Sequence, residues 1–204
     1  METLNELKSK IEKNKQDKKN RLMTTAIELF GTKGYNKTSI SDIAKKAGVA
    51  KGTFYLYFKS KEDLRSQIIS ELSCGFLKDA QESLNETKLD TFTDRLIYMI
   101  DYILNGLIER PDIVNILNKD LSLAFYSQEI TRIVNKKHST LYDMFMENLD
   151  KFNKKLKNPD ITFFMIVELV GASCYRCLVE KFPCDIQTYK PYLYDTIRLM
   201  LDNG

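Results

Sequence analysis

The stretch ISDIAKKAGVAKGTFYLYFKSK, residues 40–61, decides how this chain folds. It predicts two short helices joined by a tight turn, with Gly48 at the position that needs a positive φ. In the second helix Phe54 and Phe58 recur at i and i+4, so one face is apolar and aromatic. The opposite face carries small, hydroxylated and basic side chains, namely Lys51, Gly52, Thr53, Tyr55 and Tyr57. This arrangement is typical of a helix that packs on a core with one face and enters a DNA major groove with the other.

Helices are also predicted on both sides of this stretch. An apolar pattern over residues 17–33 indicates an amphipathic helix that ends at Gly34. Thr38 or Ser39 is placed to cap the first helix of the pair, and Asp42 follows three residues after Ser39 as in a capping box. Ser60 is placed to cap a long helix that connects this N-terminal block to the rest of the chain.

The composition excludes several classes of protein. The chain is 43% hydrophobic and 29% charged, as in globular proteins, and its four prolines and eight glycines provide few helix breakers. We therefore expect an all-α fold of about nine helices. No apolar run approaches the roughly 20 residues that span a bilayer, and the polar, Lys-rich N-terminus lacks the apolar region of a signal peptide. These features predict a cytoplasmic protein without a membrane partner.

Charge is distributed unevenly along the chain. Residues 1–61 hold 14 Lys and Arg against 6 Asp and Glu, a charge of +8, whereas the remainder holds 17 against 22, a charge of −5. A basic N-terminal block on an acidic body favours a polyanion as the partner of the first part only, although a solvated basic tail would have the same charge. The pattern of residues 1–16 fits a helical extension and a disordered basic arm equally.

Further helices are predicted in the C-terminal part. They cover about residues 90–110, 111–118, 128–152, 160–182 and 185–202. Pro111 and Pro183 interrupt the apolar patterns, and Asp160 is placed to cap the helix at 160–182. That helix is the most apolar in the chain, and the last helix is also apolar beyond a single stripe.

The segment GYNKTSISDIAKKAGVAKGTFYLYFKSKEDL, residues 34–64, closely resembles the signature of TetR-family transcriptional regulators. Its glycine turn, Tyr-x-x-Phe, lysine and acidic helix start follow in the order of that signature. The resemblance implies a basic N-terminal extension at 1–15, a helix-turn-helix DNA-binding domain at 16–76 with its motif at 39–58, and an effector-binding and dimerisation domain at 77–204. Beyond residue 80 it rests on the number and lengths of the helices alone.

The resemblance also implies which residues contact DNA. They are Thr38, Ser39, Lys51, Gly52, Thr53, Tyr55, Tyr57 and Lys61. Lys51 and Thr53 would approach base edges or phosphates, and Gly52 would permit close approach of the backbone. Lys61, a cation at a helix N-terminus, would bind a phosphate together with free N–H groups. Leu56 departs from the family pattern, and its side chain could face either the core or the groove.

Dimerisation is expected as well. The family implies a homodimer in which the helices at 160–182 and 185–202 pair into a four-helix bundle, and therefore a palindromic double-stranded operator. The small residues Gly171, Ala172 and Ser173 would let another helix approach closely. A monomer that buries both helices internally is the alternative.

An effector cavity is expected between the helices at 90–110, 128–152 and 160–182. The candidate polar residues are Tyr98, Tyr102, Asn105, Tyr142, Glu168, Tyr175 and Arg176. Glu168 and Arg176 are charges within the most apolar helix and need partners, for which structural pairing is commoner than a ligand. His138 lies beside two lysines and is expected to be solvated.

Cys174 and Cys177 are spaced so that both lie on one helix face, which suggests a thiol sensor or a metal site. Zinc needs four ligands, however, and the sequence provides no second pair of suitable spacing, so buried core cysteines are the favoured interpretation. We find no catalytic motif and expect neither a metal nor another cofactor. The sequence thus predicts a repressor released from its operator by a small apolar or amphipathic effector. A thiol-responsive regulator and a helical ligand carrier or enzyme are the alternatives.

Overall fold

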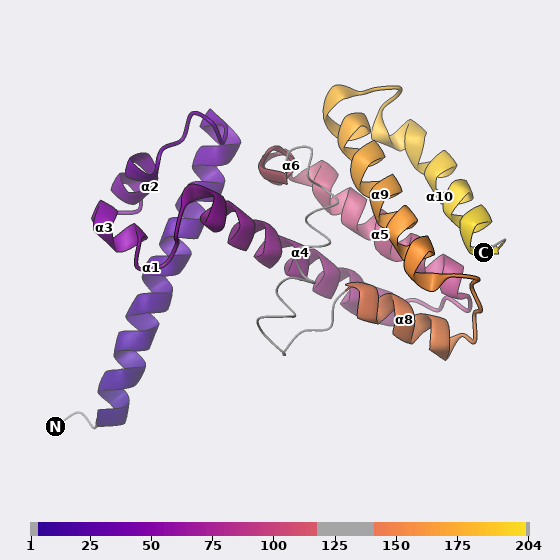
Figure 1. Ribbon diagram of the computed structural model, residues 1–204, viewed down its shortest axis with the longest axis horizontal. Helices are drawn as coiled ribbons and strands as arrows, with labels where there is room; N and C mark the ends of the chain where they lie inside the picture. Colours follow the sequence, from indigo (N-terminus) through magenta and orange to yellow (C-terminus); the bar gives the residue numbers. More distant parts are fainter. Residues whose placement is uncertain (1–3, 118–140, 203–204) are drawn as a thin grey trace. The chain divides into compact units, whose positions relative to one another are not determined.

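The computed structural model describes residues 4–117 and 141–202, and every regular element within them is helical (Figure 1). The α-helices are α1 (Leu4–Lys33), α2 (Ile40–Lys46), α3 (Lys51–Phe54), α4 (Lys61–Asn85), α5 (Phe92–Glu109), α6 (Pro111–Leu117), α8 (Leu141–Lys151), α9 (Pro159–Tyr175) and α10 (Ile186–Asp202). A π-helical turn, η1 (Arg176–Glu180), extends α9. The all-α prediction is confirmed. His138 and the start of the helix predicted at 128–152 lie outside the described residues.

The chain divides into two compact units, Met1–Ile68 and Ile69–Gly204. Helix α4 runs through the division, so its first residues belong to the N-terminal unit and the remainder to the C-terminal unit. The division lies eight residues before the domain boundary expected after residue 76.

The N-terminal unit is built on the apolar face of α1. Its core is formed by buried side chains from all four helices and from the turn after α3: Leu22, Ala26, Phe30, Ile43, Ala44, Phe54, Phe58, Leu64 and Ile68. Gly34 directly follows α1 with φ 83°, and Gly48 joins α2 to α3 with φ 67°, as predicted. Arg21 of α1 donates from Nη2 to the carbonyl oxygen of Ala47 at 2.8 Å, which places a cation at the C-terminus of α2 where the helix dipole favours it.

Helix α1 extends further toward the N-terminus than the amphipathic pattern over residues 17–33 predicted. It is continuous from Leu4, and the side chains of residues 6–18 are exposed. The question left open by the sequence is therefore answered in favour of a helical extension. No apolar face of this extension is covered by the rest of the N-terminal unit, since Leu7 and Ile11 are both exposed.

Hydrogen-bonding side chains start the helices, as expected. Ser39 and Asp42 form the predicted capping box of α2, and the Oγ of Ser60 accepts from the backbone N–H of Asp63 in α4. One predicted cap is wrong. Asn158, not Asp160, caps α9, because α9 begins at the proline that follows Asn158, one residue earlier than expected.

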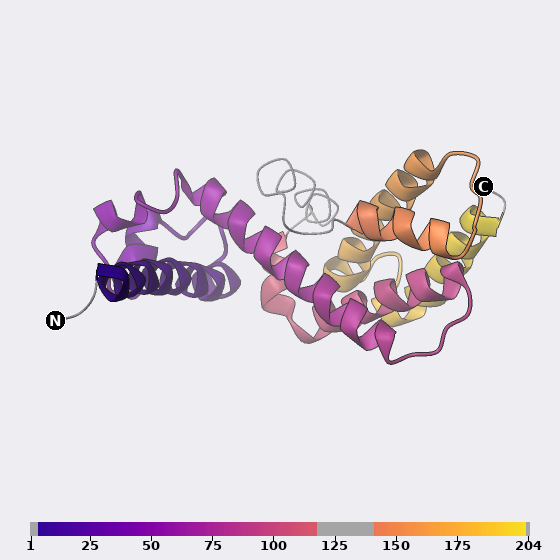
Figure 2. The ribbon, with the colours of Figure 1, turned by 90° about the horizontal axis from the view of Figure 1, so that it is seen from below.

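The C-terminal unit packs around α5. Helix α10 lies beside α5 and α9, and α8 packs against the same two helices (Figure 2). Helix α4 approaches α5 closely at Gly106, where an added Cβ would lie 2.7 Å from Cε1 of Phe76. A glycine is thus required at this point for the Phe76 ring to pack as it does.

A polar cluster fastens α10 to α5. The ammonium of Lys190, a residue only 6% exposed, donates to Oδ1 of Asp101 at 2.8 Å and to Oδ1 of Asn105 at 2.5 Å. The hydroxyl of Tyr194 donates to the same oxygen of Asp101 at 2.5 Å. Burial alone would raise the pKa of Asp101, but the hydrogen bonds from Lys190 and Tyr194 outweigh it and hold the pKa below its ordinary value. The buried cation is therefore paired and hydrogen-bonded.

Helix α9 corrects one expectation from the sequence. The helix Pro159–Glu180 is long and apolar enough to cross a membrane, although no such run was expected. Half of its apolar window is buried inside the unit, where α8 and α10 pack against it. Length and composition alone do not separate a core helix from a membrane span.

Candidate DNA-binding surface and effector cavity

Helix α3 and the turn after it have one buried and one exposed face. Phe54 is fully buried and its ring lies 5.4 Å from that of Phe58, which is also buried. Tyr55 is 53% exposed and Leu56 is 77% exposed. Leu56 therefore belongs to the outer face rather than to the core, which answers the question raised by its departure from the family pattern.

The remaining predicted residues of this helix are accessible too. Lys51 and Gly52 are exposed, and Thr53 and Tyr57 are half-buried. No neighbouring atom lies within 4 Å of where a Cβ on Gly52 would be, so no packing within the chain requires a glycine there. The face made by Lys51, Gly52, Tyr55 and Leu56 is called the α3 outer face below.

Thr38 and Lys61 have other partners in the structure. The Thr38 side chain is buried, and its hydroxyl donates to the carbonyl oxygen of Gly34 at 2.9 Å. The ammonium of Lys61 donates to the carbonyl oxygens of Tyr35 and Thr38, each at 3.0 Å, and lies 4.3 Å from the Tyr35 ring centroid. These contacts explain why a cation is tolerated at the start of α4. They favour a role in holding the turn before α2 over the phosphate contact predicted for both residues.

Tyr35 and Ser39 complete this turn. The hydroxyl of Tyr35 donates to a carboxylate oxygen of Glu62 at 2.8 Å, and burial together with that carboxylate raises the pKa of Tyr35 to about 12. The Ser39 side chain is exposed, and its hydroxyl donates to Asp42 at 2.8 Å within the capping box. Ser39 thus stands at the N-terminus of α2, where N–H groups can hold an anion.

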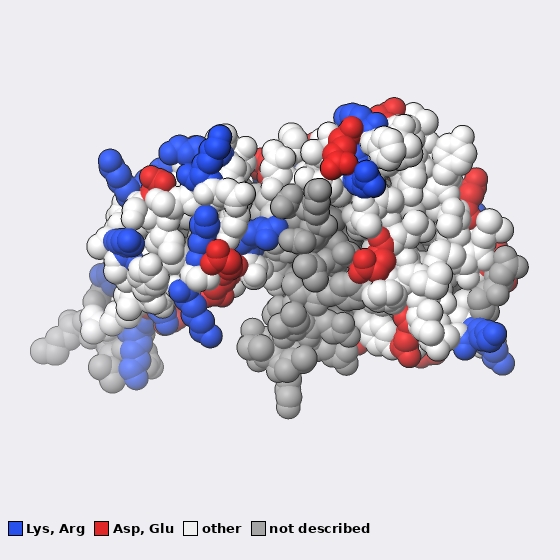
Figure 3. Space-filling view, turned by 45° about the horizontal axis from the view of Figure 1, so that its top comes forward, with Lys and Arg blue, Asp and Glu red and all other residues white. Residues whose placement is uncertain are grey.

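Basic side chains are prominent on the surface of the N-terminal unit. On the face drawn in Figure 3, Lys and Arg outnumber Asp and Glu over this unit. This agrees with the +8 charge of residues 1–61. The α3 outer face therefore lies on the part of the chain that electrostatics would direct towards a polyanion.

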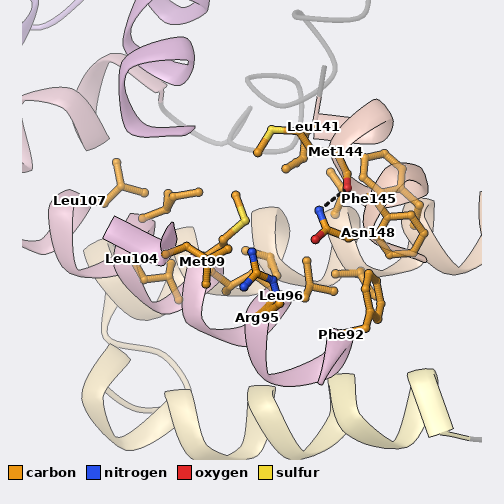
Figure 4. Close-up of a pocket in the computed structure, with 17 residues that line it drawn as sticks. Phe92, Arg95, Leu96, Met99, Leu104, Leu107, Leu141, Met144, Phe145 and Asn148 are labelled. Atoms are coloured by element: carbon orange, nitrogen blue, oxygen red, sulfur yellow. Dashed lines mark hydrogen bonds between the residues drawn. The ribbon is translucent and has the colours of Figure 1, made fainter. Parts of the chain in front are cut away.

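The C-terminal unit contains an apolar cavity of about 60 Å³ (Figure 4). It is lined by α5, α8, α9 and Leu84 of α4, so it lies between the three helices that the sequence indicated. All but two of the 17 lining residues are aliphatic, aromatic or Met. The two polar residues are Arg95 of α5 and Asn148 of α8, and both project into the cavity in Figure 4.

None of the seven polar residues suggested by the sequence lines this cavity. Asn105 belongs to the Lys190 cluster, and the hydroxyl of Tyr98 is 2.7 Å from that of Ser83. Tyr142 donates to Asp160, and Arg176 pairs with Glu180 one turn later. Tyr102, Glu168 and Tyr175 are half-buried outside the cavity lining. Structural pairing thus accounts for most of the polar groups that the sequence singled out.

Comparison with known proteins decides the family. The family described as "Bacterial regulatory proteins, tetR family" matches residues 22–68, which include α2, α3 and the start of α4. The regulator YvdT of Bacillus subtilis is 35% identical over 145 residues, 70% of this chain and 69% of that protein. The chain belongs to the TetR family. The resemblance seen in the sequence is confirmed.

Other TetR-family proteins match over different lengths. The regulator YuxN of Bacillus subtilis is 28% identical over 166 residues, which are 80% of this chain and 56% of that protein. The chain thus spans just over half the length of that relative. The solved structure of Bacillus subtilis FadR in complex with stearoyl-CoA has a TM-score of 0.63 at 22% identity and covers 90% of this chain and 98% of that one. This likeness shows that the TetR-type fold extends through the C-terminal unit.

The structure of this TetR-family chain gives no support to a sensor site at Cys174 and Cys177. Cys174 and Cys177 are buried, and burial raises the pKa of Cys174 to about 12 and raises that of Cys177. A thiol with a raised pKa carries little of the reactive thiolate at neutral pH. Among the described residues no cluster of His, Cys, Asp or Glu could hold a metal. The comparisons likewise give no support to a thiol-responsive regulator.

Sequence reasoning missed Arg95 and Asn148. A signal for Arg95 was present, because it follows Phe92 by three residues and precedes Met99 by four, so it lies on the buried stripe of α5. A cation on such a stripe needs a partner. Asn148 gave no comparable signal, because an amide among the charged residues of α8 is ordinary.

Proposed function

We propose that this TetR-family protein is a cytoplasmic transcriptional repressor that binds a palindromic operator through the α3 outer face. The observation that carries the proposal is the two-sided packing of α3: Phe54 is fully buried while Tyr55 and Leu56 are exposed. Such a helix is fixed by its core face and free to place Lys51, Tyr55 and Leu56 against base edges and phosphates. No catalytic role is proposed.

A homodimer would present two such faces. Exposed apolar side chains occur on both helices expected at the dimer interface, namely Ile161, Phe164 and Met165 on α9 and Tyr192 and Leu199 on α10. Exposed apolar groups gathered on two adjacent helices are typical of an obligate interface. We therefore propose dimerisation through α9 and α10.

The dimer is tested by replacing one exposed apolar residue with a charge. Met165 is 49% exposed, and Met165→Glu should give a monomer in sedimentation equilibrium at micromolar concentration. Leu7→Glu, at an equally exposed apolar position of α1, is the control and should remain a dimer. A dimeric Met165→Glu variant, or a monomeric Leu7→Glu variant, would place the interface elsewhere.

The effector is proposed to occupy the cavity of the C-terminal unit. FadR of Bacillus subtilis was solved with stearoyl-CoA, and an apolar chain also suits the aliphatic and aromatic lining here. Helix α4 offers a route for regulation. Leu84, near its C-terminal end, lines the cavity, and Lys61, at its N-terminal end, donates hydrogen bonds to the turn before α2. An effector that prefers one position of α4 would shift the population of operator-competent dimers.

The proposal is tested by selecting operators from a random-sequence duplex pool with the purified full chain. The expected result is a palindromic sequence with a nuclease-protection footprint over both half-sites. The affinity for this operator should fall steeply as the salt concentration rises. A helical carrier or enzyme with an incidental basic unit would select no sequence. Recovery of unrelated sequences without a footprint would contradict the proposal.

A further inference from the structure

Among the described residues that line the cavity, Arg95 alone is charged. Its Nε is buried and has no hydrogen-bond partner within the described part of the chain. The guanidinium carbon lies 5.6 Å from the ring centroid of Phe152, which fixes the group by a cation–π contact but gives Nε no acceptor. No Asp or Glu lines the cavity in the part of the chain that the structure describes.

A buried arginine N–H without a partner in the protein needs a hydrogen-bond acceptor from a bound ligand. The guanidinium is always charged and only donates, so each buried N–H without an acceptor costs its hydration. A carboxylate neutralises the charge and can accept from two guanidinium N–H groups at once. Asn148 supplies a second polar group, although its Nδ2 now donates to the carbonyl oxygen of Met144 at 2.7 Å.

The other residues that line the cavity indicate that the rest of the ligand is apolar. The cavity walls are side chains such as Met99, Phe145 and Val167, which offer no polar atom to a bound group. An apolar chain joined to one acceptor group matches this distribution. We propose that the effector is a straight-chain carboxylate whose head group is bound by Arg95. This inference rests on the proposed function, since it names the effector class of the same cavity.

The cavity is too small to hold an alkyl chain unless side chains that line it move. At about 60 Å³ it is well below the roughly 150 Å³ of an engineered cavity that accepts benzene, so an alkyl chain must displace side chains. Met99 and Met144 both line the cavity, and their unbranched side chains rearrange at low cost. Binding is therefore coupled to rearrangement of side chains on α5 and α8.

Four ligands with the same twelve-carbon chain separate the possible head groups. Equilibrium dialysis of the purified protein would compare dodecanoate, dodecanol, dodecylammonium and lauroyl-CoA below their micellar concentrations. The carboxylate should bind about ten- to a hundredfold more tightly than the alcohol, as expected for a charge-assisted hydrogen bond. Equal binding of dodecanoate and dodecanol would overturn the proposal. Tighter binding of lauroyl-CoA than of dodecanoate would overturn the carboxylate in favour of a thioester.

Variants of Arg95 test whether that residue makes the distinction. Arg95→Gln should lower the affinity for dodecanoate to that for dodecanol and leave dodecanol binding unchanged, which also shows that the cavity is intact. Arg95→Lys should keep part of the preference. Arg110→Gln is the matched control, because Arg110 is exposed and paired with Asp112 outside the cavity lining, and it should behave as wild type. An undiminished preference for dodecanoate in Arg95→Gln would contradict the assignment.

Operator binding by the same preparations separates this inference from the proposed function. If the operator is bound but none of the four ligands is, the effector assignment fails and the repressor proposal stands. If dodecanoate binds with the predicted preference but no operator is selected, the ligand assignment stands and the repressor proposal fails.

Discussion

The two units of this chain place their functional groups in opposite ways. In the N-terminal unit, the groups proposed to bind DNA stand outside a core that is complete without them, as Phe54 and Leu56 show. In the C-terminal unit, Arg95 faces inward, and its Nε has no partner within the described residues. The difference teaches that substitutions on the α3 outer face can abolish DNA binding without lowering the stability of the fold. Substitutions in the cavity, in contrast, change ligand binding and core packing together.

The largest effect expected from this comparison is in the α3 region. Phe54→Ala should lower the free energy of unfolding by about 3–5 kcal/mol, because it removes a fully buried aromatic ring from the core. Leu56→Ala, two residues away and 77% exposed, should change it by less than about 0.5 kcal/mol. Urea unfolding followed by circular dichroism measures both. Similar losses in the two variants would show that Leu56 belongs to the core.

The next effect concerns the polar cluster between α5 and α10. Lys190→Met should cost about 2 kcal/mol at pH 7, less than a fully buried pair, because the carboxylate of Asp101 is partly exposed. The folded pKa of Asp101 is held below its ordinary value of 3.8, so the stabilisation is present above that pH and is lost as the pH falls through the folded pKa.

The gap in stability between wild type and Lys190→Met should therefore narrow below about pH 4. Lys154→Met removes the more exposed Lys154–Asp202 pair and should cost less than about 1 kcal/mol. Urea titrations at several pH values measure both. A gap that stays constant down to pH 2 would show that the Asp101 carboxylate contributes nothing through its charge.

Two helix glycines of the C-terminal unit provide a matched pair of substitutions that should change the stability in opposite directions. Gly106→Ala should destabilise by about 1–3 kcal/mol, because its Cβ would lie 2.7 Å from the Phe76 ring. Gly75→Ala meets no atom within 4 Å and should stabilise α4 by about 0.5–1 kcal/mol. Thermal unfolding distinguishes the two signs. Stabilisation by Gly106→Ala would show that the ring moves aside at little cost.

A small effect on stability is expected at Gly52. Gly52→Ala also meets no atom within 4 Å and should be neutral or stabilising by up to about 1 kcal/mol. If the backbone of α3 approaches DNA closely at this point, the same methyl group should weaken operator binding severalfold. Weakened binding by a protein of undiminished stability is the expected pair of results. Unchanged operator affinity would place the backbone of Gly52 away from the DNA.

How far the sequence predicted the structure differs between the units for a physical reason. Gly34, Gly48 and Ser39 act through backbone geometry that is local in sequence, so the turns and the helix cap of the α1–α3 region could be predicted. The partners of Lys61 could not, because the carbonyl oxygens it binds lie 23 and 26 residues away.

In the C-terminal unit the helices were predictable from apolar periodicity, but the residues of the site were not. Tyr98 and Asn105 are polar in sequence and find partners through packing that no periodicity reveals. Arg95 lies on the buried stripe of α5, but the sequence does not reveal that this stripe lines a cavity. Small shifts of helix bounds also escaped prediction, as at the start of α9, where Asn158 rather than Asp160 is the cap.

The central claim, that the α3 outer face binds DNA, is tested most directly by the salt dependence of operator binding for Lys51→Ala. If Lys51 contacts a phosphate, the variant should bind the selected operator about tenfold more weakly at low salt. The slope of log affinity against log salt should become shallower by about one. Lys78→Ala, an exposed lysine of the C-terminal unit, should retain both the affinity and the slope of the wild type. Identical affinity and slope for Lys51→Ala and the wild type would contradict the claim.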